Sequence, residues 1–300
     1  MEKNIKFDIL NVLPKYFYYV ILILFFSSVF SLYLQYQNIT PPIREEIGTT
    51  EPTKAAFQAF YIVVASGLIA TLIFILFVKR KYFIIKFLFI YSFSIGVFIL
   101  LFLFFNPLEN LLEKIVYDKA FPIILIFVLF SSSLLLFGIF KAKNVYLQNH
   151  SLIVISCIFG SIIGGILEFV QLAIFLIALS LYDIFAVTIG PIGKIVDKIE
   201  KSNNNGNIIV KEYRFENSNY EITRGMFLEL DKIEIGIGDI VLYSALLSNI
   251  VSIFPFKIFL ATIGIVTGSL LTILLLLFKS SRMPGLPLPV FITLVLLYFL

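Results

Sequence analysis

Two aspartates, Asp183 and Asp239, lie inside long apolar segments of this chain. A carboxylate is costly within a lipid bilayer, so its presence there indicates a function. Two carboxyl groups that face each other at low dielectric cannot both ionise, and one of them keeps its proton. The charged member can then deprotonate a water molecule while the protonated member donates to a developing oxyanion, which is the chemistry of aspartic proteolysis. That chemistry needs no metal ion and no cofactor.

The composition places these aspartates in a membrane. The chain has 300 residues, of which 60% are hydrophobic and 14% are charged. No soluble core of this size could bury so much apolar surface, so the sequence predicts an all-α polytopic membrane protein. The net charge of +4 follows from membrane topology and gives no indication of nucleic-acid binding.

Nine segments are apolar enough to span a bilayer, given that a spanning helix needs about 20 residues. They cover 14–36, 55–78, 82–105, 121–140, 151–168, 170–192, 233–255, 257–278 and 284–300. The first is interpreted as a retained signal anchor. Almost no loop separates the fifth and sixth, so these two are expected to be antiparallel neighbours that pack tightly.

The basic residues predict the orientation, because Lys and Arg accumulate in cytoplasmic connections. With a cytoplasmic N-terminus, eighteen of the 23 basic residues fall in inside connections, and the C-terminus lies outside. Residues 1–300 then form a single membrane domain: spans one to six with the first aspartate (1–192), a cytoplasmic loop (193–232), and spans seven to nine with the second (233–300). Within the loop, 208–215 and 219–224 indicate a small hairpin.

The two aspartates are predicted to lie at one depth on consecutive antiparallel helices. Asp183 precedes the cytoplasmic end of span six, and Asp239 follows the start of span seven, so at the rise of a helix each is about 9–14 Å below the cytoplasmic surface. The alternative is that each is a polar helix contact or part of an ion pathway. No Lys or Arg at similar depth in a span could neutralise the pair as a structural salt bridge.

Three motifs occur in order on spans six, seven and nine. They are Tyr182-Asp183, then Gly236-Ile237-Gly238-Asp239, then Pro284-Gly285-Leu286-Pro287. This pattern is similar to the YD, GxGD and PAL motifs of the presenilin/signal peptide peptidase family of intramembrane aspartyl proteases. The resemblance covers the C-terminal half by motif and the whole chain by the predicted nine-span, presenilin-like topology.

The resemblance implies roles for individual residues. Asp183 and Asp239 take the places of the two catalytic aspartates. Pro284, Gly285 and Leu286 take the place of the PAL element, with Gly where Ala is usual, and Tyr182, Gly236 and Gly238 are implied as active-site support or substrate-binding residues. The substrates implied are transmembrane peptides in the lipid bilayer.

The cytoplasmic N-terminus resembles the orientation of presenilins, and no hydrophobic insert suitable for self-cleavage occurs in 193–232. Both features are similar to compact prokaryotic, particularly archaeal, members, which implies a prokaryotic cell membrane. They favour activity without accessory subunits, and a homo-oligomer is compatible with them.

The glycines and prolines of these motifs also have expected effects on the backbone. Gly236 and Gly238 leave one side of the expected helix without Cβ atoms, so another backbone can approach it. The prolines of 284–289 are expected to keep the start of span nine irregular. The alternative is that they simply occupy the first turn of a helix, where a missing N–H costs nothing, and this suits Pro284 better than Pro287 or Pro289.

Two alternatives stay open. One is an ion- or proton-coupled transporter or channel that uses the paired carboxylates, although the first four spans show no repeat of the motifs. The other is a prepilin-peptidase-like GxGD protease, which typically carries a Lys soon after the motif, and this chain has none there. Zinc and serine intramembrane proteases are excluded, since the one histidine, His150, lies in a connection.

Overall fold

A computed structural model describes residues 2–36, 53–54, 57, 61, 82–105, 108, 120–141, 144–188, 227–230, 233–279 and 284–299. Most of these residues are helical, because a backbone in lipid must satisfy its own hydrogen bonds. The helices are α1 (Glu2–Tyr36), α4 (Tyr82–Phe105), α6 (Ala120–Phe140), α7 (Val145–Ile166), α8 (Phe169–Thr188), α11 (Ile237–Ile253), the short 3-10 helix η2 (Pro255–Lys257), α12 (Ile258–Lys279) and α13 (Pro287–Phe299).

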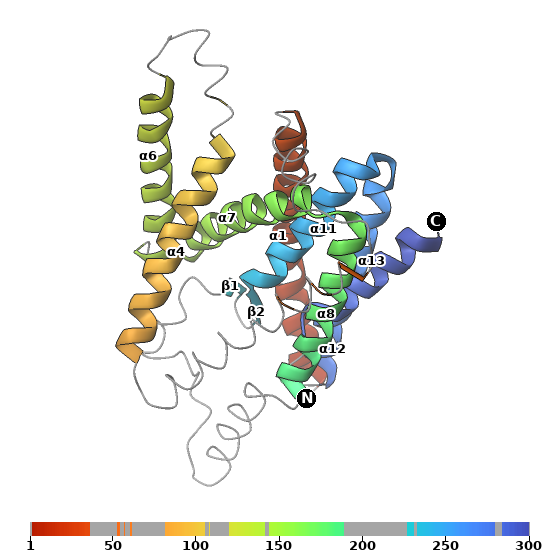
Figure 1. Ribbon diagram of the computed structural model, residues 1–300. Helices are drawn as coiled ribbons and strands as arrows, with labels where there is room; N and C mark the ends of the chain where they lie inside the picture. Colours follow the sequence, from red (N-terminus) through yellow and green to blue (C-terminus); the bar gives the residue numbers. More distant parts are fainter. Residues whose placement is uncertain are drawn as a thin grey trace, which may run out of the picture.

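Helix α11 lies at the centre of the bundle. It contacts α7 most extensively, and also α1, α12 and α8, while α13 packs between α12 and α8. Helices α4 and α6 lie beside each other at the edge of the molecule and pack against α7 (Figure 1). The element that carries Asp239 is therefore held on several sides by other helices.

Small residues let α7 approach α11 closely. A Cβ added at Gly160 would collide with the backbone of Val241, and one added at Gly164 would collide with the backbone of Ala245. Serine hydroxyls cross the same seam: Ser244 Oγ donates to the carbonyl of Cys157 (3.0 Å). Close approach and interhelical hydrogen bonds are how helices associate in lipid, where burial of apolar surface gives no net driving force.

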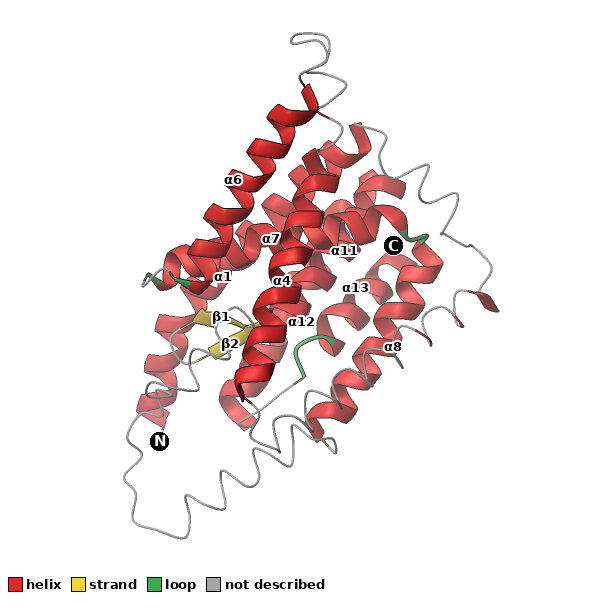
Figure 2. Cartoon of the chain, turned by 60° about the vertical axis from the view of Figure 1, so that its left-hand side comes forward, coloured by secondary structure: helices red, strands yellow, loops and turns green. Residues whose placement is uncertain are grey.

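Two short strands precede α11 and lie beside α1 (Figure 2). Strand β1 (Phe227–Leu230) pairs antiparallel with β2 (Ile233–Gly236), with Phe227 opposite Gly236 and Leu230 opposite Ile233. The prediction that span seven is helical from 233 is wrong, because alternating Ile and Glu favour a strand there and glycine is a poor helix former. The hairpin predicted over 208–224 lies outside the described residues.

Eight of the nine predicted spans correspond to described helices, and span 55–78 falls largely outside the described residues. Within the described part, four helices are long and apolar enough to cross a membrane: Leu13–Tyr36, Phe121–Phe140, Val145–Ile166 and Pro255–Leu276. Shorter apolar helices cover Ile90–Phe105, Phe169–Phe185, Ile237–Ile253 and Pro287–Phe299. The chain is thus a mostly helical, multi-pass integral membrane protein.

The expected tight pairing of spans five and six is wrong. A turn at Leu167 and Glu168 does join α7 to α8, as the sequence predicts. After this turn, however, α8 packs against α13 and α11, whereas α7 packs against α11 and α1. The physical reason is that the glycine face of α7 fits the backbone of α11, so α11 occupies the position that α8 was expected to take.

Candidate active site

The two aspartates come from different elements. Asp183 lies near the C-terminal end of α8, and Asp239 lies in the first turn of α11, directly after β2. Both side chains are partly buried. Each carboxyl group lies against the segment that precedes α13, Asp183 at Leu286 and Asp239 at Gly285. That the two act as a pair stays a prediction.

The segment Pro284–Leu286 joins the two aspartates. The N–H of Leu286 donates to Asp183 Oδ2 (3.3 Å), and the N–H of Gly285 faces the same carboxylate. On its other side Gly285 lies against Asp239, since a Cβ added to this glycine would lie 3.1 Å from Asp239 Cγ. One non-helical segment therefore contacts both carboxyl groups.

Tyr243 holds this segment in place from α11. Its hydroxyl donates to the carbonyl of Gly285 (2.9 Å), and the side chain is buried. Tyr243 lies one turn after Asp239 on α11, but its acceptor belongs to the segment that leads into α13. The sequence alone does not place that segment beside α11.

The prolines mark the start of α13, and the irregular start predicted for span nine is confirmed. Helix α13 begins at Pro287, and residues 284–286 are non-helical. The helix-start explanation therefore suits Pro287 and Pro289, which lie in the first turn where the backbone N–H has no intrahelical acceptor. Because 284–286 stay outside the helix, the N–H of Leu286 can bind Asp183.

The two glycines of the GxGD motif differ in their surroundings. Gly236 ends β2 and is the N-cap of α11, with an extended backbone (φ −62°, ψ 135°), so it does not lie within a helix as predicted. A Cβ at Gly236 would lie 3.6 Å from Asp239 Oδ2. Gly238 is exposed, and an added Cβ there would meet no described atom within 4 Å.

Tyr182 precedes Asp183 on α8 and is partly buried. Sequence reasoning missed Asn149, which is fully buried near the start of α7 and binds the backbone of β1. The signal that could have found it is the polar run Gln148-Asn149-His150 at the head of an otherwise apolar helix.

This arrangement places both carboxyl groups at one segment, with a backbone N–H donor beside Asp183. Two carboxyl groups that face each other at low dielectric do not both ionise, so one of them keeps its proton. An ionised carboxylate beside a protonated one supplies a base and an acid at one place. Within the described residues, no cluster of three or more His, Cys, Asp or Glu side chains offers a metal site.

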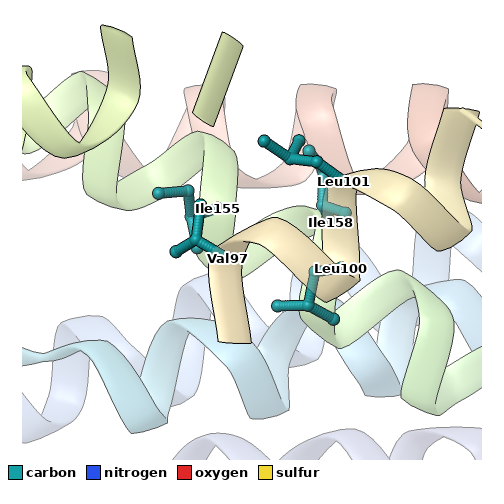
Figure 3. Close-up of a pocket in the computed structure, with 5 residues that line it drawn as sticks. All are labelled: Val97, Leu100, Leu101, Ile155 and Ile158. Atoms are coloured by element: carbon teal, nitrogen blue, oxygen red, sulfur yellow. The ribbon is translucent and has the colours of Figure 1, made fainter. Parts of the chain in front are cut away.

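Two hollows elsewhere in the described residues contain neither aspartate. One lies between α4 and α7 and has no room for a water molecule; it is lined by Val97, Leu100, Leu101, Ile155 and Ile158 (Figure 3). A larger cavity of about 480 Å³ lies among α8, α13 and the segment of Phe254 and η2, with Lys257 as its charged lining residue. The Nζ of Lys257 donates to the carbonyl of Leu297 (3.0 Å).

Two known proteins are similar to this chain, one in sequence and one in structure. The chain is 27% identical over 165 residues to Presenilin-B of Dictyostelium discoideum, which covers 54% of this chain and 32% of that protein. The chain thus spans about a third of the length of this curated relative. A solved structure described as a presenilin family intramembrane aspartate protease aligns with 92% of this chain and 97% of its own, at 19% identity and a TM-score of 0.49. No protein-family profile matches the chain.

Proposed function

We propose that this chain, which is presenilin-like in sequence, is an intramembrane aspartyl protease that hydrolyses peptide bonds of transmembrane helical substrates. The observation that carries the proposal is that one segment, Pro284–Leu286, contacts both Asp183 and Asp239. A polar helix contact would need only one carboxylate and one partner, whereas a hydrolytic dyad needs two carboxyl groups held at a fixed separation.

The reaction follows from the different surroundings of the two aspartates. Asp183 accepts the N–H of Leu286, so it is the ionised member that takes a proton from water. The resulting hydroxyl attacks the carbonyl carbon of the scissile bond, while protonated Asp239 donates its proton to the carbonyl oxygen. Collapse of the tetrahedral intermediate breaks the C–N bond, and the proton held by Asp183 goes to the leaving amine. As the new carboxyl group forms, Asp239 takes a proton from a hydroxyl of the intermediate, so Asp183 is again ionised and Asp239 is again protonated.

The remaining family residues support this site. Gly285 gives Asp239 room, and Leu286 supplies the N–H, while Pro284 precedes them outside the helix. Gly236 and Gly238 leave space on the approach to Asp239, and Tyr182 stays a candidate for substrate contact beside Asp183.

A helical substrate must unwind before attack, because each of its carbonyls is hydrogen-bonded in the helix. The unwound backbone then needs partners, and an extended peptide can obtain them by adding to a strand edge. The hairpin predicted within 208–224 could supply such an edge, but it lies outside the described residues. The edge of β2 is better placed, since β2 runs directly into α11 and Asp239.

We extend the proposal to the whole chain. It forms one membrane domain of nine spans with a cytoplasmic N-terminus, a cytoplasmic loop over 193–232 and an extracytoplasmic C-terminus. It resides in a prokaryotic cell membrane and acts without accessory subunits, as a monomer or a homo-oligomer, on transmembrane peptides.

The test uses the purified chain in liposomes with a transmembrane peptide. We expect cleavage by the wild type, and a loss of about a hundredfold or more in Asp183→Asn and in Asp239→Asn, because each removes the acid–base function. Glu168→Gln, at the turn between α7 and α8, is the matched carboxyl-to-amide control and should cleave normally. Cleavage that survives both aspartate changes, or ion-coupled uptake without any cleavage, would refute the proposal.

A further inference from the structure

We propose that Asn149 is a positioning residue for the reaction, because its side chain clamps β1 and thereby fixes β2 and Asp239. This inference rests on the proposed function for its catalytic consequence, but the clamp itself is a structural feature that can be measured separately. Asn149 lies in the first turns of α7, far in sequence from both aspartates.

The side-chain amide of Asn149 binds both backbone groups of one strand residue. The N–H of Glu229 donates to Asn149 Oδ1 (3.1 Å), and Asn149 Nδ2 donates to the carbonyl of Glu229 (2.8 Å). A primary amide carries its donor and acceptor side by side, so it satisfies the strand residue as a neighbouring strand would.

The amide is itself fixed. Its Nδ2 also donates to the hydroxyl oxygen of Tyr19 on α1 (3.1 Å), and Asn149 is fully buried. A buried polar group that loses its partner costs about 1–3 kcal/mol, so this arrangement resists displacement. Beside it, Leu228 and Leu230 are buried in a cluster with Tyr16 and Tyr19 of α1. The strand is thus held by hydrogen bonds and by packing.

The clamp determines which edge of the strand pair is engaged. In an antiparallel pair, successive residues direct their backbone groups alternately toward and away from the partner strand. Because Glu229 directs its groups to Asn149, Leu228 and Leu230 direct theirs to β2, opposite Ile235 and Ile233. On β2, the backbone groups that point away from β1 are then those of Glu234 and Gly236. Asn149 therefore occupies the β1 edge and leaves the β2 edge for an extended peptide.

The clamp also acts on the catalytic group. β2 ends at Gly236 and α11 begins at Ile237, with Asp239 in its first turn, so no loop absorbs a movement of β2. Helix α7 meanwhile packs along α11 through Gly160 and Gly164. One helix therefore holds both the strand pair and the helix that carries Asp239, and Asn149 sets their relative position.

The test compares three variants of the purified full-length chain. Asn149→Leu removes all three hydrogen bonds, whereas Asn149→Asp keeps the acceptor for Glu229 and loses both Nδ2 donors. Asn249→Leu is the matched control: Asn249 is equally buried, and its Nδ2 donates to the carbonyls of Gly164 (2.8 Å) and Leu167 (2.6 Å) at the other end of α7. This variant removes hydrogen bonds of a buried side-chain amide at a site that does not contact β1.

Hydrogen exchange measures the clamp, and peptide cleavage measures its consequence. In Asn149→Leu we expect residues 227–236 to exchange about tenfold faster or more than in the wild type or in Asn249→Leu. We expect kcat to fall about tenfold to a hundredfold with a smaller change in KM, since a misplacement of about 1 Å costs that much. Asn249→Leu, corrected for the folded fraction, should keep the wild-type kcat.

Unchanged exchange at 227–236 would overturn the clamp, and faster exchange with an unchanged kcat would overturn the positioning role. If Asn149→Leu does not fold, Asn149→Asp supplies both measurements with smaller expected effects in the same direction. If the wild type cleaves no peptide, the proposed function fails, and the exchange result still decides whether Asn149 holds the strands.

Discussion

Gly285 lies between the two aspartates and beside each of them. Its N–H faces Asp183, its carbonyl accepts the hydroxyl of Tyr243, and its Cα lies against the carboxyl group of Asp239. The family motif that the sequence resembles has Ala at this place. In this chain an added methyl group would occupy the space of the Asp239 carboxyl group, so the glycine is matched to the position of that aspartate.

Replacing Gly285 by the Ala of that motif should therefore impair this protein. In Gly285→Ala we expect peptide cleavage to fall about tenfold or more, because the Asp239 carboxyl group must move away from the methyl group. The unfolding temperature should change little, since the end of a side chain can yield at low cost. Cleavage rates and thermal unfolding in detergent measure the two effects.

The control for this prediction is Gly96→Ala on α4, where an added Cβ would meet no described atom within 4 Å. That variant should cleave like the wild type. Wild-type cleavage by Gly285→Ala would show that Asp239 is not confined by this contact.

At the residue scale, the sequence identifies the two aspartates of the proposed pair but not the contacts that surround them. Asp183 and Asp239 stand out because carboxylates are rare within apolar segments. The hydrogen bond from Tyr243 to Gly285 joins residues 42 positions apart, so its partner depends on how α13 packs. Asn149 escaped notice for the same reason, because an amide has no defined role until the strand beside it is known.

At the scale of elements, the seam between α7 and α11 holds these two helices together. Gly160 and Gly164 lie against α11. At the end of α7, where carbonyls lack an intrahelical N–H donor, Asn249 of α11 donates hydrogen bonds to two of them. The four-residue spacing of these glycines is typical of a close helix contact, and the structure shows such a contact with α11. The spacing alone does not identify the helix that makes it.

Widening this seam should destabilise the fold. We expect Gly164→Val to lower the free energy of unfolding by about 1–3 kcal/mol, because its side chain would collide with the backbone of Ala245. Gly96→Val is the matched control, since it introduces the same side chain into a helix where described atoms leave the position open. Reversible unfolding in detergent measures the free energy of unfolding of both variants. An equal decrease in the two would contradict the close contact of Gly164 with α11.

The boundaries of the elements show where sequence patterns were insufficient. Hydropathy gave one apolar segment from 233, yet the structure divides it into β2 and α11 at Gly236. A short run of alternating residues was hidden by the apolar helix that follows it. The boundary matters for function, because it places Asp239 in a first helical turn rather than in the middle of a helix.

At the scale of the whole molecule, the described helices fit a protein surrounded by lipid. Large apolar side chains such as Phe127, Phe130 and Leu134 are exposed on α6, and others are exposed on α1 and α4. In water such surfaces would cause aggregation, whereas in a bilayer they face the acyl chains. The membrane class was predictable from composition alone, since it depends on the sum of many residues and not on any one contact.

The proposed orientation can be tested by thiol labelling, for which this chain is well suited. Its one cysteine, Cys157, is fully buried, so background labelling should be low. On intact cells, a membrane-impermeant thiol reagent should label Thr49→Cys and Tyr298→Cys, which the proposal places outside. It should label Ser202→Cys, in the proposed cytoplasmic loop, only after the membrane is permeabilised.

The excess of Lys and Arg in the proposed cytoplasmic connections is the physical reason for this pattern, because such connections are retained inside. The reverse labelling pattern would invert the proposed topology, and labelling of Thr49→Cys and Tyr298→Cys from opposite sides would rule out the proposed number of spans between them.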